Sequence, residues 1–309
     1  MSGFHLRHMQ PDDRDEVSRL IFHSTNQYYL SIGRAEIFQG DDLAASAIFD
    51  VYADLDPGQG LVAVDDESGQ IIGSCFVHPR ETHVSLGIMN AHPDHFGRGV
   101  ARAILQRIID DAQAAAKSVR LVSSLFNLDS YSLYTRAGFT PFCTFQDMYL
   151  SVPEGGLAHD APSGVTVREA TPEDVDAMAS LELSVSGISR VADYRYFIVN
   201  DSGLWHVSVI ASTTGGLDGF LVSCGAEALN MLGPGVARTE QQTAALVHAE
   251  LNRHAGRSPV FLLPVHCGEL VRTLYDWGAR NCEMHVAQVH GEGNSPDGVV
   301  MPTFLPETG

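Results

Sequence analysis

The sequence predicts an α/β (α+β) fold of two tandem domains, each with a mixed, mostly antiparallel central sheet flanked by helices. Three observations predict it. The chain has 309 residues, enough for two domains that each bury a core of their own. The segment 151–164 is rich in Pro and Gly, lacks apolar periodicity and is typical of a linker. Beyond it, residues 167–174 repeat the pattern of residues 6–13, a short strand followed by a proline-led helix start.

Hydrophobic periodicity divides the first half, residues 1–150, into successive elements. Helical spacing indicates helices that we expect at 12–29, 34–52 and 102–116. Short apolar runs bounded by turn residues indicate strands, which we expect at 60–64, 71–78, 83–91 and 119–126. A tyrosine-bearing helix closed by a glycine follows within 127–139.

A glycine turn opens the helix expected at 102–116. Gly97 and Gly99 let the chain turn without a Cβ atom and bring backbone N–H groups close to a ligand. The unsatisfied N–H groups of the first helical turn add a partial positive charge, so the turn predicts a ligand that carries phosphate. A Rossmann-type loop is the competing interpretation. It needs a small residue where Arg102 stands and an acidic residue where the next strand ends in Phe126-Asn127.

The order of strand, glycine turn, helix, strand and tyrosine helix resembles the GNAT superfamily of acetyl-CoA-dependent N-acetyltransferases. Two segments carry the resemblance: the proline-to-glycine turn from Pro93 to Ala101, and the Asn, Leu-Tyr and Gly-Phe positions of 127–139. Phe96 stands where the family usually has Arg or Gln, which removes one polar side chain but leaves the backbone donors. The resemblance covers residues 4–150 and implies acetyl-CoA as co-substrate.

The resemblance also implies where the coenzyme would bind. The turn would cradle its pyrophosphate, the backbone of the preceding strand would pair with the pantetheine arm, and an asparagine would bond the pantetheine amides. The expected cofactor-binding residues are Met89, Asn90, Ala91, Phe96, Gly97, Arg98, Gly99, Val100, Ala101 and Asn127. Local positive charge would come from the N–H groups and from cations such as Arg98, Arg102 and Arg136.

Acetyl transfer from a thioester to an amine needs an uncharged amine, a stabilised oxyanion and a proton for the leaving thiolate. The amine can attack directly in a ternary complex, without a covalent enzyme intermediate. Tyr134 is the expected general acid, because the pKa of a phenol is close to that of the coenzyme thiol. The alternative is that Tyr134 is simply a packed aromatic residue.

The sequence offers several candidates for the general base. Many family members place a glutamate on the strand before the glycine turn, and counting back without gaps puts that position at or next to Ser85, which is no base by itself. His83 lies two residues earlier on the same strand face and titrates near neutrality. A surface histidine flanking a hairpin is the alternative for His83, and Glu81 and His78 are further candidates.

Composition narrows the classes of partner. Nineteen basic and 38 acidic side chains give a net charge of −19, which disfavours nucleic acid and anionic membranes. No apolar run approaches about 20 residues, so we expect a cytoplasmic protein. Five scattered cysteines without a Cys-x-x-Cys pair indicate reduced thiols and no structural zinc, and His92 and His95 are expected in a solvated loop, not at a metal.

The second half, 165–291, is expected to be a degenerate copy of the first. Ninety positions separate Arg7 from Gly97, but only 65 separate Arg168 from Gly233. The expected strand 226–232 runs almost directly into Gly-Pro-Gly, where Pro234 removes an N–H donor. Residues 239–242 instead have the pattern of a helix-capping box.

Two further features concern the end of that half. Leu274-Tyr275 before Gly278 echoes Leu133-Tyr134 before Gly138, although less closely than the strand and helix start. The tail 292–309 is expected to be loosely ordered.

The leading hypothesis is an N-acetyltransferase that acts on the primary amine of a small molecule, with catalysis confined to the first half. A non-catalytic acyl-CoA-binding protein and a protein N-acetyltransferase are the alternatives. Residues 26–56 are rich in Tyr and Asp, which suits a cationic amine. The sequence leaves a homodimer open.

Overall fold

A computed structural model describes residues 3–226, 229–293, 295–303 and 305. These residues form two compact units. The first unit contains 3–79, 84–119 and 305, and the second contains 80–83 and the described part of 120–303. No helix in the described ranges is both long and apolar enough to cross a membrane.

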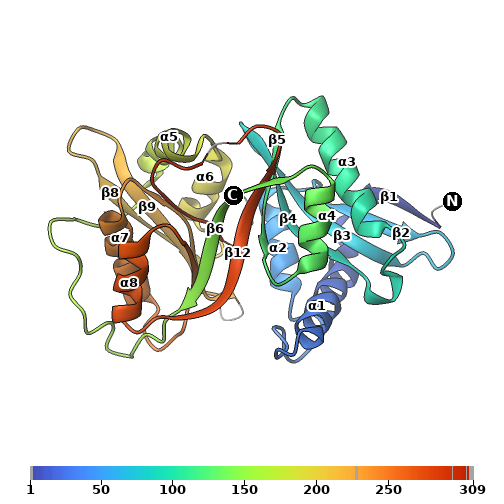
Figure 1. Ribbon diagram of the computed structural model, residues 1–309, viewed down its shortest axis with the longest axis horizontal. Coiled ribbons are helices and arrows are strands. Elements are labelled where there is room, and N and C mark those ends of the chain that lie inside the picture. The colour runs from blue at the N-terminus through green and yellow to red at the C-terminus, as the bar shows by residue number, and fades with distance from the viewer. Residues whose placement is uncertain (1–2, 227–228, 294, 304, 306–309) are drawn as a thin grey trace. The chain divides into compact units, whose positions relative to one another are not determined.

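The order of helices and strands occurs twice along the chain (Figure 1). The first repeat consists of β1 (Phe4–His8), α1 (Arg14–Ser31), α2 (Ser46–Leu55), β2 (Leu61–Asp65), β3 (Ile71–Pro79), β4 (His83–Ala91), α3 (Val100–Ala114), β5 (Ser118–Ser124), α4 (Leu128–Arg136) and β6 (Thr140–Tyr149). The second consists of β7 (Arg168–Glu169), α5 (Val175–Ser186), α6 (Val191–Val199), β8 (Trp205–Ala211), β9 (Leu217–Cys224), β10 (Met231–Ala237), α7 (Glu240–Arg253), β11 (Val260–Pro264), α8 (Gly268–Asp276) and β12 (Arg280–His290). The predicted α/β (α+β) fold with an internal repeat is confirmed.

Both repeats begin with the same local ion pair. Arg7 donates to the two carboxylate oxygens of Asp13 at 2.6 and 2.8 Å, and Arg168 donates to those of Asp174 at 2.7 and 2.7 Å. In each repeat the aspartate also closes a capping box at the proline-led turn before the first helix. The echo seen in the sequence therefore has a physical basis, a strand tied to its following helix by a bidentate arginine.

The first unit contains an antiparallel sheet of strand order β1-β2-β3-β4. Helix α3 covers one face, where a Cβ atom on Gly73 of β3 would clash with a methyl carbon of Val100. Helices α1 and α2 cover the other face, where Tyr52 of α2 stacks on Phe76 at 4.4 Å between ring centroids. Residues 73 and 76 of one strand point to opposite faces, so the sheet is a central layer between helices.

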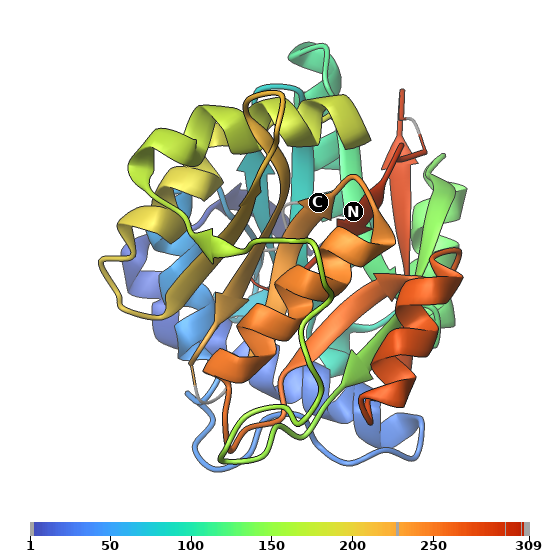
Figure 2. The ribbon, with the colours of Figure 1, turned by 90° about the vertical axis from the view of Figure 1, so that its left-hand side faces the viewer.

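In the second unit the strand order is β5-β12-β6-β11-β10-β9-β8-β7. Helix α7 lies against β8, β9 and β10 and beside α8 (Figure 2). Alternate residues of β9 contact helices on opposite faces: a Cβ on Gly219 would lie 3.0 Å from Leu246 of α7, and Phe220 packs on Tyr194 of α6 with ring centroids 5.1 Å apart. The second repeat is thus also a sheet between helices.

The two repeats exchange their last strands. Strand β6 pairs antiparallel with β11 and with β12, which both come from the second repeat. Strand β12 in turn lies between β5 and β6 of the first repeat, and the N–H of Leu125, just after β5, donates to Met284 O of β12 at 2.9 Å. Because of this exchange, residues 120–150 belong to the second compact unit although they belong to the first repeat.

The helix expected at 34–52 is much shorter in the structure. Only Ser46–Leu55 is helical, and residues 34–45 form turns and irregular backbone. The buried side chain of Asn26 accepts hydrogen bonds from the N–H groups of Ile37 and Phe38 at 3.0 and 2.9 Å, and donates to Phe38 O at 2.8 Å. These bonds replace the intrahelical ones that a longer helix would have made.

Two further corrections concern the second repeat. Its fourth strand, β10, spans Met231–Ala237 and not 226–232, so the Gly-Pro-Gly sequence lies inside a strand and not in a turn before a helix. Part of the tail expected to be loosely ordered forms β13 (Val299–Met301), which pairs antiparallel with β10. Val299 and Met301 are buried in this strand, and the β-branched residues Val299 and Val300 favour strand structure. Residues 227–228, 294, 304 and 306–309 lie outside the described residues.

Candidate functional site

The glycine turn before α3 has the backbone conformation that its sequence predicted. Gly97 and Gly99 have φ values of +79° and +84°, in the left-handed region that side chains disfavour. Within the described chain, no atom lies within 4 Å of where their Cβ atoms would be, so the space beside the turn is open. Phe96 is 67% exposed next to it. The turn therefore needs glycine for its backbone conformation and to let a ligand approach the backbone, not for packing.

Four backbone donors at the start of α3 point out of the helix. The first bond of the helical ladder runs from Ala103 N–H to Gly99 O at 2.9 Å, so the N–H groups of residues 99–102 precede the ladder. Among the described residues these four groups have no backbone acceptor outside the helix. A helix N-terminus with open donors and a left-handed glycine turn fits a pyrophosphate, because N–H groups and the helix dipole both favour an anion.

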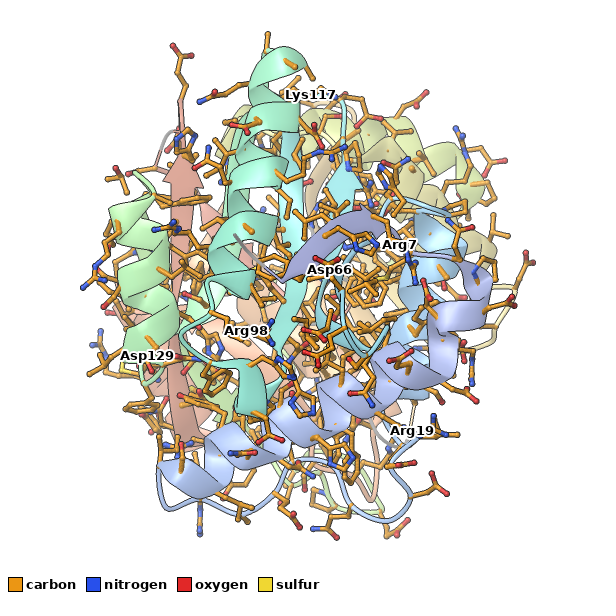
Figure 3. All side chains as sticks on the ribbon, turned by 90° about the vertical axis from the view of Figure 1, so that its right-hand side faces the viewer. Arg7, Arg19, Asp66, Arg98, Lys117 and Asp129 are labelled. Carbon is orange, nitrogen blue, oxygen red and sulfur yellow. The ribbon has the colours of Figure 1, made fainter. Side chains whose placement is uncertain are left out.

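The side chain of Arg98 is used to hold the turn. Its Nη2 donates to Oδ1 of Asp65 at the end of β2, at 2.9 Å, and its Nη1 contacts Nδ1 of His95. Figure 3 shows Arg98 at the N-terminal end of α3, opposite Lys117 at the other end. Hydrogen bonds from Ser68 and then from Arg98 lower the pKa of Asp65 from 3.8 to about 2. Arg98 thus positions the turn, and the donors left open beside it are backbone N–H groups.

The end of β4 presents backbone groups on the edge away from β3. His92 N–H donates to Ile72 O at 2.9 Å, which identifies this as a hydrogen-bonded pair of the antiparallel ladder. Because such pairs alternate, Asn90 is bonded to β3, whereas the N–H and C=O groups of Met89 and Ala91 point to the opposite edge. Of the three residues predicted to pair with the pantetheine arm, Met89 and Ala91 have the backbone direction that an added strand needs.

A β-bulge lies in the middle of β4. Leu86 is opposite Val77 and Met89 is opposite Cys75, so β4 has one residue more than β3 across this interval. The bulge includes Gly87, where a Cβ atom would lie 2.9 Å from Nε2 of His78. A bulge disrupts the local ladder and leaves backbone groups unpaired. An unpaired N–H group that points out of the sheet can donate to a carbonyl oxygen and polarise it.

One of the candidate bases, His78, is held by a carboxylate. It is fully buried, its Nδ1 is hydrogen-bonded to a carboxylate oxygen of Asp56, and its ring stacks on Tyr52 at 4.8 Å between centroids. It lies opposite Ser85 in the β3–β4 ladder. An imidazole whose Nδ1–H donates to a carboxylate carries its lone pair on Nε2, and this Nε2 lies beside Gly87 of the bulge.

The other candidate bases have different surroundings. His83 and Ser85 are buried, and Nδ1 of His83 lies 3.0 Å from the hydroxyl of Thr82. Glu81 is exposed in the turn between β3 and β4. The surface position that was the alternative for His83 is therefore wrong, because the start of β4 is covered.

Two polar acceptors lie on the face of this sheet that α1 covers. Asn90 donates from Nδ2 to the Ser24 hydroxyl of α1 at 2.7 Å, while its buried Oδ1 has no hydrogen-bond partner among the described residues. The hydroxyl of Ser74, opposite Asn90 in the ladder, is likewise buried without a partner there. Buried polar atoms without partners are uncommon and mark places where a ligand can bind. Nothing in the sequence distinguished Ser24 or Ser74.

Tyr134 and Asn127 belong to the second unit, on α4. Tyr134 is 5% exposed and its ring centroid lies 5.8 Å from that of Phe139. Asn127 is the N-cap of α4, since its Oδ1 accepts a hydrogen bond from Ser130 N–H at 3.0 Å. The Nδ2 group of Asn127 takes no part in this cap.

The second repeat has no tyrosine at the position of Tyr134. Phe139 N–H donates to Tyr134 O at 3.1 Å, and after α8 the N–H of Ala279 donates in the same way to Leu274 O at 2.9 Å. Each of these helices is followed by a glycine with positive φ. Leu274 therefore corresponds to Tyr134, and the sequence echo that paired Tyr275 with Tyr134 was wrong by one residue.

The start of α7 also differs from the start of α3. Thr239 is in extended conformation, and its hydroxyl accepts a hydrogen bond from Gln242 N–H at 3.2 Å. The capping pattern predicted at 239–242 is confirmed. A side chain of the chain itself thus occupies the place where the first repeat offers open donors.

His92 and His95 lie in the 3-10 turn between β4 and α3. His92 Nδ1 accepts from Asp94 N–H at 3.2 Å, and the two imidazole centroids are 5.4 Å apart. Across the described ranges, no group of three or more His, Cys, Asp or Glu side chains is arranged to hold a metal ion.

Comparison with known proteins relates the glycine turn and the sheet around it to the acetyltransferases. The family model of the acetyltransferase (GNAT) domain matches residues 56–141, which include both the turn and α4. The segment 56–141 is thus similar to the GNAT acetyltransferase domain, and this similarity together with the fold supports acetyl transfer. Over 73 residues the chain is 34% identical to the UPF0157 protein YqkA of Bacillus subtilis (strain 168), covering 24% of this chain. The match spans 21% of that relative's length.

Solved structures share the fold over nearly the whole chain. A protein of Pyrococcus horikoshii assigned to the acetyltransferases superposes with a TM-score of 0.71 and 13% identity, covering 100% of this chain and 94% of its own. A GCN5-related N-acetyltransferase from Sphaerobacter thermophilus superposes with a TM-score of 0.65 and 18% identity, and the match covers 96% of this chain and 98% of that protein. A tandem GNAT protein from the clavulanic acid biosynthesis pathway superposes with a TM-score of 0.59 and 13% identity, and the match covers 94% of this chain and 100% of that protein. The tandem GNAT fold is thus confirmed at identities that show the fold alone.

Proposed function

We propose that the chain is an acetyl-CoA-dependent N-acetyltransferase that transfers the acetyl group to the primary amine of a small molecule. The observation that carries the proposal is the start of α3, where a left-handed glycine turn leaves four N–H groups open, next in sequence to a strand whose end presents Met89 and Ala91 backbone groups. The turn suits a pyrophosphate and the strand edge suits an amide-containing arm. Both are features of one coenzyme A molecule.

The acetyl group would arrive as the thioester of the bound coenzyme. In our proposal the amine nitrogen attacks the thioester carbonyl directly, backbone groups at the bulge of β4 stabilise the oxyanion, and the carbon–sulfur bond then breaks. Tyr134 gives its phenolic proton to the leaving thiolate. No covalent intermediate on the protein is needed.

The base in our proposal is His78, which Asp56 orients through Nδ1, so that Nε2 takes the ammonium proton directly or through water. This assignment replaces the position of Ser85, which has no basic group, and keeps His83 as the competing base on the neighbouring strand. Glu81 is less suited, because it is exposed in the turn.

The acceptor in our proposal is a small cationic amine. Asn90 Oδ1 and the Ser74 hydroxyl, both buried without partners among the described residues, are hydrogen-bond acceptors for an ammonium group. Segment 26–56 adds the aromatic ring of Tyr52 and carboxylates such as Asp54 on the same side of β3 as α2. A cytoplasmic location belongs to the same proposal, since it gives access to acetyl-CoA.

An acetyl-transfer screen with the full chain tests the proposal. Purified protein and acetyl-CoA are incubated with polyamines, amino sugars, amino acids and peptides with free N-termini, and thiol release and product mass are followed. Amine-dependent thiol release with a small-molecule product supports the proposal. Acetylation of peptides alone would favour a protein N-acetyltransferase. Coenzyme binding by calorimetry without turnover on any amine would favour a non-catalytic acyl-CoA-binding protein.

A further inference from the structure

A small cavity lies inside the second unit, away from the glycine turn in sequence. Its volume is about 20 Å³. Its wall includes Arg120 of β5, Phe142 of β6, Glu182 and Ser186 of α5, and Arg190 just before α6. Two arginines and one glutamate on the wall of an otherwise apolar cavity are unusual, because buried charges need partners.

The charges around this cavity do not balance. Arg190 donates to both oxygens of Glu182, from Nε at 2.9 Å and from Nη2 at 2.5 Å. Nearby in the same unit, Arg80 pairs with Asp193 at 2.6 Å, and the carboxylate of Asp193 acts electrostatically on Glu182. All four of these side chains are at most 4% exposed. Arg120 is a third buried arginine beside these two pairs, and the carboxylate of Glu182 acts on it electrostatically.

Arg120 forms no ion pair with a carboxylate among the described residues, and Glu182, the carboxylate that acts on it electrostatically, is already bound by Arg190. Arg120 is 5% exposed, its guanidinium carbon lies 4.8 Å from the ring centroid of Phe142, and its buried Nε has no hydrogen-bond partner among the described residues. Burial lowers the pKa of Arg120 to about 10, which still leaves the group charged at neutral pH. A buried cation with an unsatisfied donor beside a cavity is the arrangement that a bound anion would complete.

We propose that the cavity binds one halide ion, chloride under physiological conditions, as the counter-ion of Arg120. The size of the cavity decides the class of anion. A volume of about 10–15 Å³ admits one water molecule, so a cavity of about 20 Å³ suits a monatomic anion better than a polyatomic one. A water molecule would satisfy the Nε–H but would leave the excess charge.

Bromide replaces chloride in the first experiment, because it can be located by anomalous scattering. Crystals of the full chain grown or soaked in sodium bromide are expected to show an anomalous peak inside the cavity, next to the guanidinium of Arg120. A cavity that contains only water or no density, in crystals where bromide is found elsewhere on the surface, would overturn the proposal.

Thermal unfolding gives an independent readout. The melting temperature of the wild-type chain is expected to rise saturably with sodium chloride or bromide, relative to sodium gluconate at the same ionic strength, because an ion that binds only the folded state stabilises it.

In the Arg120→Met variant, the halide-specific part of this rise in melting temperature is expected to be lost. Arg272→Met, which removes an exposed arginine, is the matched control and keeps the wild-type dependence. Equal dependence in wild type and Arg120→Met would show that the effect is screening and not a site, and if Arg120→Met does not fold, the bromide crystals decide.

Discussion

Arg98 and Asp65 are joined by a hydrogen bond of 2.9 Å that ties the glycine turn before α3 to the end of β2. Arg98 lies between the two glycines whose backbone the coenzyme would contact, yet its own side chain points to a carboxylate of the chain. In this turn the side chain provides the position and the backbone provides the donors. The distinction explains why an arginine next to a phosphate site need not be a phosphate ligand.

The pKa of Asp65 leads to a prediction on acid stability. Its folded-state pKa is lowered from 3.8 to about 2 by donors from Ser68 and Arg98, so the stabilisation is present above about pH 4 and is lost as the pH falls toward 2. Asp65→Asn is expected to flatten the fall of the melting temperature between about pH 4 and pH 2. Asp66→Asn, an exposed neighbour, is the control and should keep the wild-type slope. An unchanged slope in Asp65→Asn would show that the bond does not persist in solution.

Gly99→Ala tests the phosphate turn. An alanine at φ +84° costs about 1–2 kcal/mol in the left-handed region, and relief of that strain would rotate the N–H groups at the start of α3. We expect coenzyme A affinity, measured by calorimetry, to fall by more than about tenfold. Gly203→Ala, at φ +71° with open space around it, carries the same strain far from the turn in sequence and should leave affinity unchanged. Equal affinities for the two variants would contradict the site.

Tyr134→Phe tests the general acid. The substitution removes only the hydroxyl from a side chain that packs on Phe139, so the fold should be retained. We expect turnover to fall by roughly 10²–10⁴-fold with coenzyme affinity nearly intact. Tyr275→Phe, on the exposed face of α8, should have no effect on either quantity. Unchanged turnover in Tyr134→Phe, with chemistry shown to be rate-limiting, would assign the proton to water or another group.

His78→Gln and His83→Gln distinguish the two candidate bases. If His78 is the base, its replacement lowers turnover by roughly 10²–10⁴-fold at neutral pH, and activity recovers at higher pH, where more of the amine is uncharged. The matched His83→Gln variant should keep a near-normal pH–rate profile. The reverse result would assign the base to His83, and a uniform loss at every pH would indicate structural damage.

Cleavage of the linker tests the exchange of strands. A protease site inserted at the exposed residues 158–161 would separate the two repeats covalently. Because β6 lies between β11 and β12, the fragments are expected to elute together in size-exclusion chromatography until denaturant is added.

A fragment ending near residue 153, expressed alone, should be insoluble, since β6 would expose both edges. Fragments that separate after cleavage, each of them folded, would contradict the exchanged pairing.

The sequence by itself determined the local features. Gly97 and Gly99 predicted a turn before the helix, because the left-handed backbone conformation of such a turn favours glycine. Arg7 and Asp13 recurred as Arg168 and Asp174 because strand, proline turn and helix start depend on neighbours a few residues apart. The helix at 34–52 was predicted too long, since the bonds from Asn26 that prevent it come from another helix.

Only the tertiary structure decided which distant residues meet. The pairing of β6 with β12 joins residues more than 130 positions apart, and antiparallel pairing has no sequence signature that names its partner. Leu274 was found to match Tyr134 only through the hydrogen bonds that close the two helices. The dyad of His78 with Asp56 and the unbalanced charge of Arg120 likewise depend on burial and on contacts across the fold. Periodicity and turn chemistry act over a few residues, whereas a site depends on which side chains the completed packing brings together.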